Sequence, residues 1–228
     1  MIIKKQPMTN FALIFDMDGV IADTAELHQK AWIDFANELG LQMSPETFRD
    51  KLFGRANREI FNIVLDRNVG DAELEELITK KERLYRQYAQ GKLKPLAGLE
   101  DFLKLAQAAK IRMAVASAAP QINVEFTLRE TNLAAYFDHI TGAEEVERGK
   151  PDPQVFEITA RKLNFKPQQC LVFEDSHAGL EAAQKANMKV IGIASTHPAG
   201  AISGDYPVVK DFREVDLEMV KEQFNTEG

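Results

Sequence analysis

Short runs of apolar residues alternate along much of this chain with longer stretches in which apolar residues recur every three or four positions. Runs without polar alternation are typical of strands buried on both faces, and the longer stretches are typical of amphipathic helices. Strands separated by helices predict a parallel sheet and the α/β class. The expected strands are Phe11–Phe15, Arg112–Ser117, His139–Thr141, Cys170–Glu174, Lys189–Ile193 and Tyr206–Val209. The expected helices between the later strands are Leu99–Ala109, Gln121–Thr131, Pro153–Leu163 and Ala178–Ala186.

Residues 24–95 break this rhythm, because they hold several helical patterns in succession and no convincing strand. Gly40 and Gly91 are plausible helix ends, and Pro95 closes the segment. A crossover between parallel strands needs only about a dozen residues. We therefore expect a helical cap domain, residues 24–95, inserted after the first strand of a Rossmann-like core formed by residues 1–23 and 96–228.

The net charge of −7 over 228 residues argues against nucleic acid and anionic membranes as general partners, since both require surplus Lys and Arg. Cys170 is the single cysteine of the sequence, so no internal disulfide can form, and its apolar neighbours predict a buried structural thiol. The first ten residues lack an apolar run long enough for a signal peptide, and no stretch of the chain approaches a membrane span. We expect a cytoplasmic monomer.

Polar residues of types that can act in catalysis or bind ligands follow four of the expected strands. In open parallel sheets, ligands bind at the carboxyl ends of the strands, so side chains at these ends should meet at one edge. Taken singly, each has an ordinary explanation, such as a turn at Asp18 and Gly19 or a solvated surface lysine. Together they indicate a site. Its expected members are Asp16, Asp18, Ser117, Lys150, Glu174 and Asp175.

The expected site is rich in carboxylates, which would repel one another unless a cation were bound or some were protonated. No His or Cys stands among them at ligand spacing, and an all-oxygen set suits Mg²⁺. Lys150 and Ser117 are suitable donors to phosphate oxygens. A cation, a lysine and hydroxyl donors are the usual parts of phosphoryl transfer, in which a carboxylate can also be the nucleophile.

Four motifs resemble those of haloacid dehalogenase-like phosphotransferases: "DMDGV", "VAS", "GKPDP" and "VFEDSHAGLEAA", in the same order and each at an expected strand end. The resemblance spans nearly the whole chain, the inserted cap included. It implies that Asp16 is the nucleophile and Asp18 the general acid and base. It further implies phosphate binding by Ser117, Ala118 and Lys150, and Mg²⁺ binding by Asp16, Asp18, Glu174 and Asp175.

The stretch "DTAELHQKAW" is similar to the corresponding part of the β-phosphoglucomutase subgroup. This similarity implies that His28 helps to place the general acid and that Lys81 meets the sugar phosphate. Structural alternatives stand beside both roles. His28 lies one turn before Trp32 and would pack against it, and Lys81 would belong to an exposed charged helix face.

A further structural interpretation applies to the start of this stretch. Asp23 and Glu26 have the spacing of a helix capping box, with Asp in the place of Ser or Thr. The same residues would then serve to begin the first helix of the cap.

The cap departs from the mutase pattern at "GRANRE", which begins at Gly54. Asn57 occupies the position of the arginine that grips the second phosphate in mutases. Arg55 and Arg58 flank it, but a bidentate arginine contact is not moved by one residue without consequence. The sequence therefore favours a Mg²⁺-dependent phosphatase acting on a small phosphorylated metabolite, a sugar phosphate by class. The alternative is a β-phosphoglucomutase. A non-catalytic relative is disfavoured because every expected catalytic position is filled.

Overall fold

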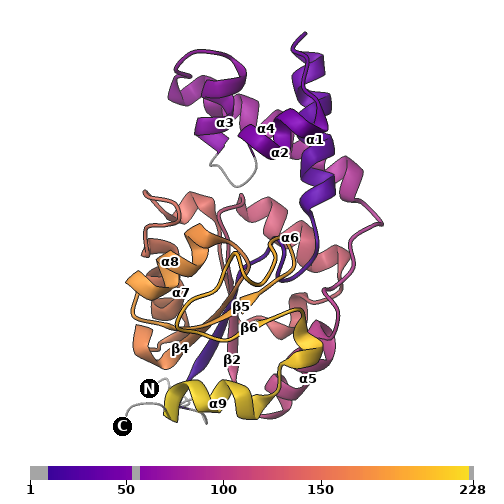
Figure 1. Ribbon diagram of the computed structural model, residues 1–228. Helices are drawn as coiled ribbons and strands as arrows, with labels where there is room; N and C mark the ends of the chain where they lie inside the picture. Colours follow the sequence, from indigo (N-terminus) through magenta and orange to yellow (C-terminus); the bar gives the residue numbers. More distant parts are fainter. Residues whose placement is uncertain (1–9, 53–56, 226–228) are drawn as a thin grey trace, which may run out of the picture. The chain divides into compact units, whose positions relative to one another are not determined.

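The structure is a computed structural model that describes residues 10–52 and 57–225. Its sheet is fully parallel, with the strand order β3-β2-β1-β4-β5-β6 (Figure 1). This order reverses direction between β1 and β4, which makes that pair the topological switch point of a doubly wound sheet. The α/β class is confirmed. The strands are β1 (Ala12–Phe15), β2 (Arg112–Ala116), β3 (His139–Thr141), β4 (Cys170–Glu174), β5 (Lys189–Ile193) and β6 (Val208–Val209).

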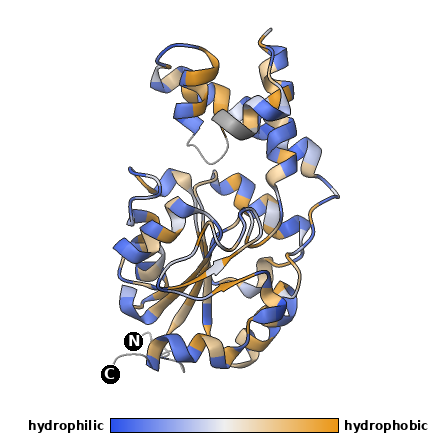
Figure 2. Ribbon diagram, in the orientation of Figure 1, coloured by the Kyte–Doolittle hydropathy of each residue, from blue (hydrophilic) through white to orange (hydrophobic). Residues whose placement is uncertain are grey.

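Helices cover both faces of this sheet, and the strands are hydrophobic on both sides for that reason (Figure 2). On one face, Leu13 and Phe15 of β1 pack with α5 (Leu99–Ala108), α6 (Gln121–Glu130) and α9 (Leu217–Asn225). On the other face, Ala12 and Ile14 pack with α7 (Gln154–Leu163) and α8 (His177–Lys185). Burial of successive residues toward opposite faces is what the alternation of side chains along a strand requires.

The chain divides into two compact units, Met1–Asp23 with Lys94–Gly228, and Thr24–Leu93. The second unit is built from α1 (Ala25–Glu38), α2 (Pro45–Lys51), α3 (Asn57–Val64) and α4 (Asp71–Ala89). It has a hydrophobic core of its own, in which Trp32, Phe35 and Phe61 pack against one another. The helical insertion after the first strand is therefore confirmed as part of the fold.

The ends of the inserted helices follow from their sequence, with one exception. Gly40 and Gly91 adopt positive φ just beyond α1 and α4, as expected of glycines that end helices. The side chain of Ser44 accepts a hydrogen bond from the Thr47 amide and caps α2. The predicted capping box at Asp23 is wrong, because the N-cap of α1 is Thr24 and its side chain makes no capping hydrogen bond.

Two further differences from the sequence-based expectations concern the C-terminal part. The helix α9 was not expected, although Val220 is fully buried in the core. The last strand is shorter than the expected Tyr206–Val209, because Val208 and Val209 alone pair with β5. Short 3₁₀ segments also occur at Ala134–Tyr136, Ala143–Glu145, Pro167–Gln169 and Phe212–Glu214.

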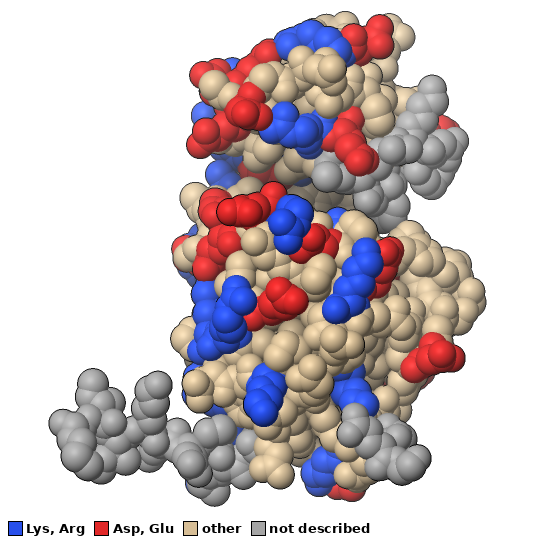
Figure 3. All heavy atoms as spheres, turned by 90° about the vertical axis from the view of Figure 1, so that its left-hand side faces the viewer, with Lys and Arg blue, Asp and Glu red and all other residues tan. Residues whose placement is uncertain are grey.

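The outer surface is mixed in charge. On the face shown in Figure 3, acidic and basic side chains are interspersed over both units. Among the described helices, none combines the length and the apolar character needed to cross a membrane.

Candidate active site

Asp16 stands at the carboxyl end of β1, at the switch point of the sheet. Its backbone N–H donates to the carbonyl oxygen of Phe173 in β4 at 3.0 Å, which continues the strand pairing up to the first carboxylate. The side chain of Asp16 is buried, whereas Asp18 is half-buried. The two carboxylates thus emerge from one strand end into different environments.

The turn after Asp18 depends on a glycine. Gly19 has a φ of +78°, and a Cβ atom built at this position would lie 2.0 Å from Oδ2 of Asp175. Glycine is therefore required both by the backbone conformation and by the close approach of a second carboxylate. The Asp18–Gly19 turn packs directly against the loop that follows β4.

Glu174 ends β4 with both of its carboxylate oxygens engaged. Oε1 accepts hydrogen bonds from the amides of Asp175 and Ser176, at 3.1 and 3.0 Å, and from the Ser176 hydroxyl at 2.8 Å. Oε2 lies 2.7 Å from Nζ of Lys150. The hydroxyl of Ser176 also accepts a hydrogen bond from the amide of Gly179 and so caps α8. The same hydroxyl therefore links the start of α8 to the Glu174 carboxylate.

Lys150 bridges two strand ends. Its Nζ lies 2.5 Å from Oδ1 of Asp16 as well as within reach of Glu174, and it sits over the ring of Phe156 at 4.9 Å from the centroid. The side chain is 8% exposed. Burial lowers the pKa of Lys150, but the charges of Asp16 and Glu174 outweigh burial and raise it overall. The lysine is therefore held in its cationic form.

The carboxylates form a buried cluster in which one oxygen each of Asp16, Glu174 and Asp175 lies within 4.8 Å of the others. Burial, reinforced by Glu174, raises the pKa of Asp16 to about 8 even though Lys150 opposes the shift. Burial likewise raises the pKa of Asp175 well above its ordinary value, with Glu174 and Asp16 adding to the effect. Buried carboxylates that repel one another are stabilised by a divalent cation, and an all-oxygen donor set fits Mg²⁺.

Ser117 lies at the end of β2, next to this cluster in the order of the sheet. It is buried, its amide donates to Thr141 at 3.0 Å, and its Oγ accepts from the amide of Ala119 at 3.0 Å. Ala118, in between, is exposed. The hydroxyl is thus fixed in place at a strand end, where a ligand of the sheet edge would meet it.

Two polar residues of the same unit were missed by the sequence reasoning. Oγ of Ser195 donates to the carbonyl oxygen of Gly19 at 2.5 Å, and Oγ1 of Thr196 donates to Oδ2 of Asp175. Both residues follow β5 closely, so the rule that ligands gather at the carboxyl ends of strands would have found them had it been applied to this strand as well.

In the helical unit, His28 and Lys81 meet. Nζ of Lys81 lies 3.0 Å from Nδ1 of His28 and 2.9 Å from Oε1 of Glu82. The ring of His28 stacks on Tyr85, with centroids 3.9 Å apart, and Lys81 lies over the Trp32 ring. Lys81 and Glu82 are buried. The interpretation of Lys81 as part of an exposed charged face is therefore wrong, and His28 packs on Tyr85 of α4.

The region of the missing cap arginine is described in part. Gly54 and Arg55 lie outside the described residues. Asn57 begins α3 and is half-buried. The guanidinium of Arg58 donates to the carbonyl oxygen of Val69 at 3.2 Å and pairs with Asp71 at 2.6 Å. Arg58 is thus engaged by the segment that leads into α4.

The comparison with known proteins agrees with this architecture. The family model of the haloacid dehalogenase-like hydrolases matches residues 13–193. The chain is 32% identical to a fructose-1-phosphate phosphatase of Escherichia coli, over 79% of this chain and 95% of that protein. It is 28% identical to a chloroplastic 5-amino-6-(5-phospho-D-ribitylamino)uracil phosphatase of Arabidopsis thaliana, over 94% of this chain but 58% of the longer relative.

Among solved structures, the chain is similar to a β-phosphoglucomutase from Clostridium difficile. The TM-score is 0.81 and the sequence identity 27%, over 94% of this chain and 96% of that one. Similarity of this kind covers the inserted helices as well as the sheet.

Proposed function

This chain belongs to the haloacid dehalogenase-like hydrolases, in the subgroup of β-phosphoglucomutases and related phosphatases, and we propose that it is a phosphatase dependent on Mg²⁺. Its substrate is a small phosphorylated metabolite, a sugar phosphate by class. The observation that carries the proposal is the contact of Lys150 with both Asp16 and Glu174, because it joins a nucleophile, a cation and an acidic metal-binding cluster at one sheet edge.

Asp16 is the nucleophile of the proposed reaction. One of its carboxylate oxygens attacks phosphorus, and the bond from phosphorus to the substrate oxygen breaks as the aspartyl-phosphate forms. Asp18, protonated at the start, gives its proton to the leaving oxygen. It then takes a proton from the water that attacks the aspartyl-phosphate, so that phosphate is released and both carboxyl groups return to their starting forms.

The other residues of the site neutralise the charge of the transferring phosphoryl group and hold it in position. Lys150 neutralises the transferring group, and the Ser117 hydroxyl with the Ala118 amide donates to its oxygens, which is the stabilisation that phosphoryl transfer requires. Asp16, Glu174 and Asp175, with the backbone carbonyl of Asp18, would hold Mg²⁺. When bound, the cation supplies positive charge to the phosphoryl oxygens and relieves the repulsion among the carboxylates.

The choice of phosphatase over mutase is supported by the cap. A mutase must retain a second phosphate, and the side chain at the expected position is the neutral Asn57, while Arg58 is engaged by Val69 and Asp71. Hydrolysis makes no such demand. β-Phosphoglucomutase is the second candidate, favoured by the similarity to the Clostridium difficile enzyme and by the contact of Lys81 with His28.

One assay separates these functions. The protein is supplied with Mg²⁺ and a panel of sugar phosphates, including β-glucose 1-phosphate with a trace of the bisphosphate. We expect phosphate release that is lost in Asp16→Asn and retained in Asp101→Asn, whose side chain is exposed on α5. Rapid formation of glucose 6-phosphate with little free phosphate would instead establish the mutase. A wild-type protein that is inert over the whole panel would refute both.

A further inference from the structure

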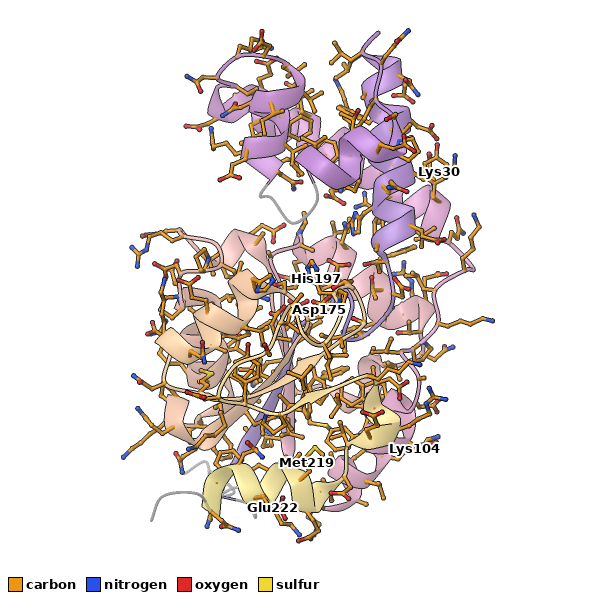
Figure 4. All side chains as sticks on the ribbon, viewed as in Figure 1. Lys30, Lys104, Asp175, His197, Met219 and Glu222 are labelled. Carbon is orange, nitrogen blue, oxygen red and sulfur yellow. The ribbon has the colours of Figure 1, made fainter. Side chains whose placement is uncertain are left out.

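The segment that follows β5 contacts the loops of the candidate site through two consecutive residues, Ser195 and Thr196. Residues 195–197 lie just beyond the part of the chain that matches the family model, which ends at residue 193. They are half-buried and belong to the same unit as the carboxylate cluster. Asp175 and His197 are labelled in Figure 4, and the residue before His197, Thr196, is hydrogen-bonded to Asp175.

Ser195 holds the turn that carries Asp18. Its hydroxyl donates to the carbonyl oxygen of Gly19 at 2.5 Å, and its Oγ would lie 3.0 Å from a Cβ atom built on Gly19. The hydroxyl therefore packs against the turn as well as bonding to it. A turn whose glycine has a positive φ needs such contacts to keep one conformation, because glycine has the most backbone freedom to lose.

Thr196 holds the carboxylate of Asp175. Its hydroxyl donates to Oδ2, the oxygen that also lies closest to Gly19. A hydrogen bond from a neighbouring hydroxyl restricts the rotation of a carboxylate and so sets its orientation. The Asp175 carboxylate belongs to the cluster of Asp16, Glu174 and Asp175, so Thr196 holds one of the groups that would bind a cation.

His197 gives the segment a third contact with the site. Its ring centroid lies 5.5 Å from that of His177, the first residue of α8, which follows Asp175 by two positions. The segment therefore contacts the loop after β1 through Ser195, the loop after β4 through Thr196, and the start of α8 through His197. All three attachments are within a few residues of the expected metal ligands.

We propose that Ser195 and Thr196 are positioning residues for the metal site: Thr196 orients Asp175 toward the cation, and Ser195 fixes the Asp18–Gly19 turn against which Asp175 packs. Groups that hydrogen-bond to metal ligands set ligand orientation, and their loss typically weakens metal binding about 10- to 100-fold. The inference rests on the proposed function, because it assumes that the carboxylate cluster binds a divalent cation.

The test measures binding of Mn²⁺ alone, from the free Mn²⁺ signal in electron paramagnetic resonance, without substrate. Thr196→Val removes the hydroxyl and keeps the shape, Thr196→Ala removes it without adding a methyl group in its place, and Thr196→Ser restores it. Ser195→Ala removes the contact with Gly19. Ser203→Ala is the matched control, because Ser203 also donates to a glycine carbonyl nearby, that of Gly200, but is exposed.

We expect Thr196→Val and Thr196→Ala to bind Mn²⁺ about 10- to 100-fold more weakly than wild type, with Thr196→Ser near wild type. Ser195→Ala should weaken Mn²⁺ binding by a smaller factor. In the double variant with Thr196→Val, the loss of affinity should differ from the product of the two single losses, because both residues act on Asp175. Ser203→Ala should bind as wild type does. Thermal unfolding of each variant without metal reports whether the fold is kept.

Equal Mn²⁺ affinity in folded wild type, Thr196→Val and Thr196→Ala would overturn the inference. So would an equal loss in Ser203→Ala, since it would point to a general effect of the segment. Failure of the proposed function is recognised separately: a wild type that binds Mn²⁺ but releases no phosphate from any substrate would refute the phosphatase and leave the role of Thr196 standing. A wild type that binds no Mn²⁺ would refute both.

Discussion

Lys150 of the α/β unit and Lys81 of the helical unit are alike in their immediate surroundings. Each is largely buried, each pairs with a glutamate, and each lies about 5 Å from the centre of an aromatic ring, at 4.9 Å from Phe156 and 5.0 Å from Trp32. They differ in where their partners come from. Lys150 contacts carboxylates 134 and 24 residues away along the chain, whereas the glutamate partner of Lys81 is the next residue, Glu82.

This difference shows how the two regions are assembled. The sheet brings Asp16 and Glu174 together because β1 and β4 are parallel neighbours, with Phe15 opposite Phe173 in the register. Strand order therefore determines which charges meet Lys150. In the helical unit, the rotation and packing of α1 and α4 determine that Lys81 reaches His28. A motif can predict the first kind of contact, and side-chain packing decides the second.

The largest effect should come from removing the lysine of the α/β unit. Lys150→Met leaves two buried carboxylates without the lysine charge and removes the proposed donor to the phosphoryl group, and we expect kcat/KM for phosphate release to fall by at least about 10³-fold. Lys81→Met should lower the stability of the helical unit by about 3 kcal/mol, because the buried carboxylate of Glu82 loses the positive charge of Lys81, with a smaller loss of kcat/KM. Steady-state kinetics and denaturant unfolding check both. Equal losses of kcat/KM in Lys150→Met and Lys81→Met would contradict the difference drawn between the two lysines.

Aromatic truncations should separate the stabilities of the two units. Phe173 packs against Phe15 and Phe102 in the core of the sheet, and Phe61 packs against Trp32 and Phe35 in the helical unit. We expect Phe173→Ala and Phe61→Ala to destabilise their own unit by about 3 to 4 kcal/mol. Hydrogen exchange, measured separately for residues 24–93 and for the rest of the chain, reports which unit has lost stability. A loss spread equally over both units in either variant would contradict two independent cores.

A smaller effect should follow from crowding Glu174. A Cβ atom on Gly179 would lie 1.9 Å from Oε2 of Glu174, so Gly179→Ala must displace a carboxylate that Lys150 holds. We expect kcat/KM to fall by about 10- to 100-fold, since small displacements of catalytic groups have effects of that size. Gly200→Ala, with open space around its Cβ position, is the control. Unchanged kinetics in Gly179→Ala would show that Glu174 can move without consequence.

The smallest effect concerns a carboxylate away from the site. Side-chain hydrogen bonds from Arg213 lower the pKa of Asp211 to about 2, so the folded protein holds this carboxylate ionised more readily than the unfolded chain does. Its stabilisation is therefore fully present above about pH 4 and is lost as the pH falls toward 2. Arg213 is mostly exposed, which limits the contribution to less than about 1 kcal/mol.

Unfolding of wild type and Asp211→Asn between pH 5 and 2 measures this contribution. The difference in the free energy of unfolding should shrink as the pH falls through this range. A difference that grows toward low pH would contradict the assigned direction of the pKa shift.

The sequence was most informative where strand ends fix positions. The apolar runs predicted β3, β4 and β5 to the residue, and the residues that follow β1 and β4 do meet at one sheet edge. Cys170 is buried, and burial raises the pKa of its thiol to about 12, as expected of a structural cysteine. These outcomes depend on strand order and alternation, which the pattern of apolar residues encodes.

Contacts that depend on side-chain packing could not be predicted in the same way. The stacking of His28 on Tyr85 joins residues of two helices whose relative rotation the sequence pattern does not specify. The capping box at Asp23 failed because the helix begins one residue later than the motif implies. Ser195 and Thr196 could have been found, because they follow a predicted strand, but hydroxyl residues are common in loops and draw attention only once their partners are known.

The central claim is that Asp16 carries the phosphoryl group during the reaction, and rapid acid quench followed by mass spectrometry tests it most directly. The protein is mixed with Mg²⁺ and a sugar phosphate that it hydrolyses, quenched within the first turnover, and digested. We predict a transient phosphoryl group on the peptide that contains Asp16, absent from Asp16→Asn under the same conditions. Phosphate release that proceeds in wild type with no phosphorylated peptide at any quench time, or undiminished release by Asp16→Asn, would contradict the account.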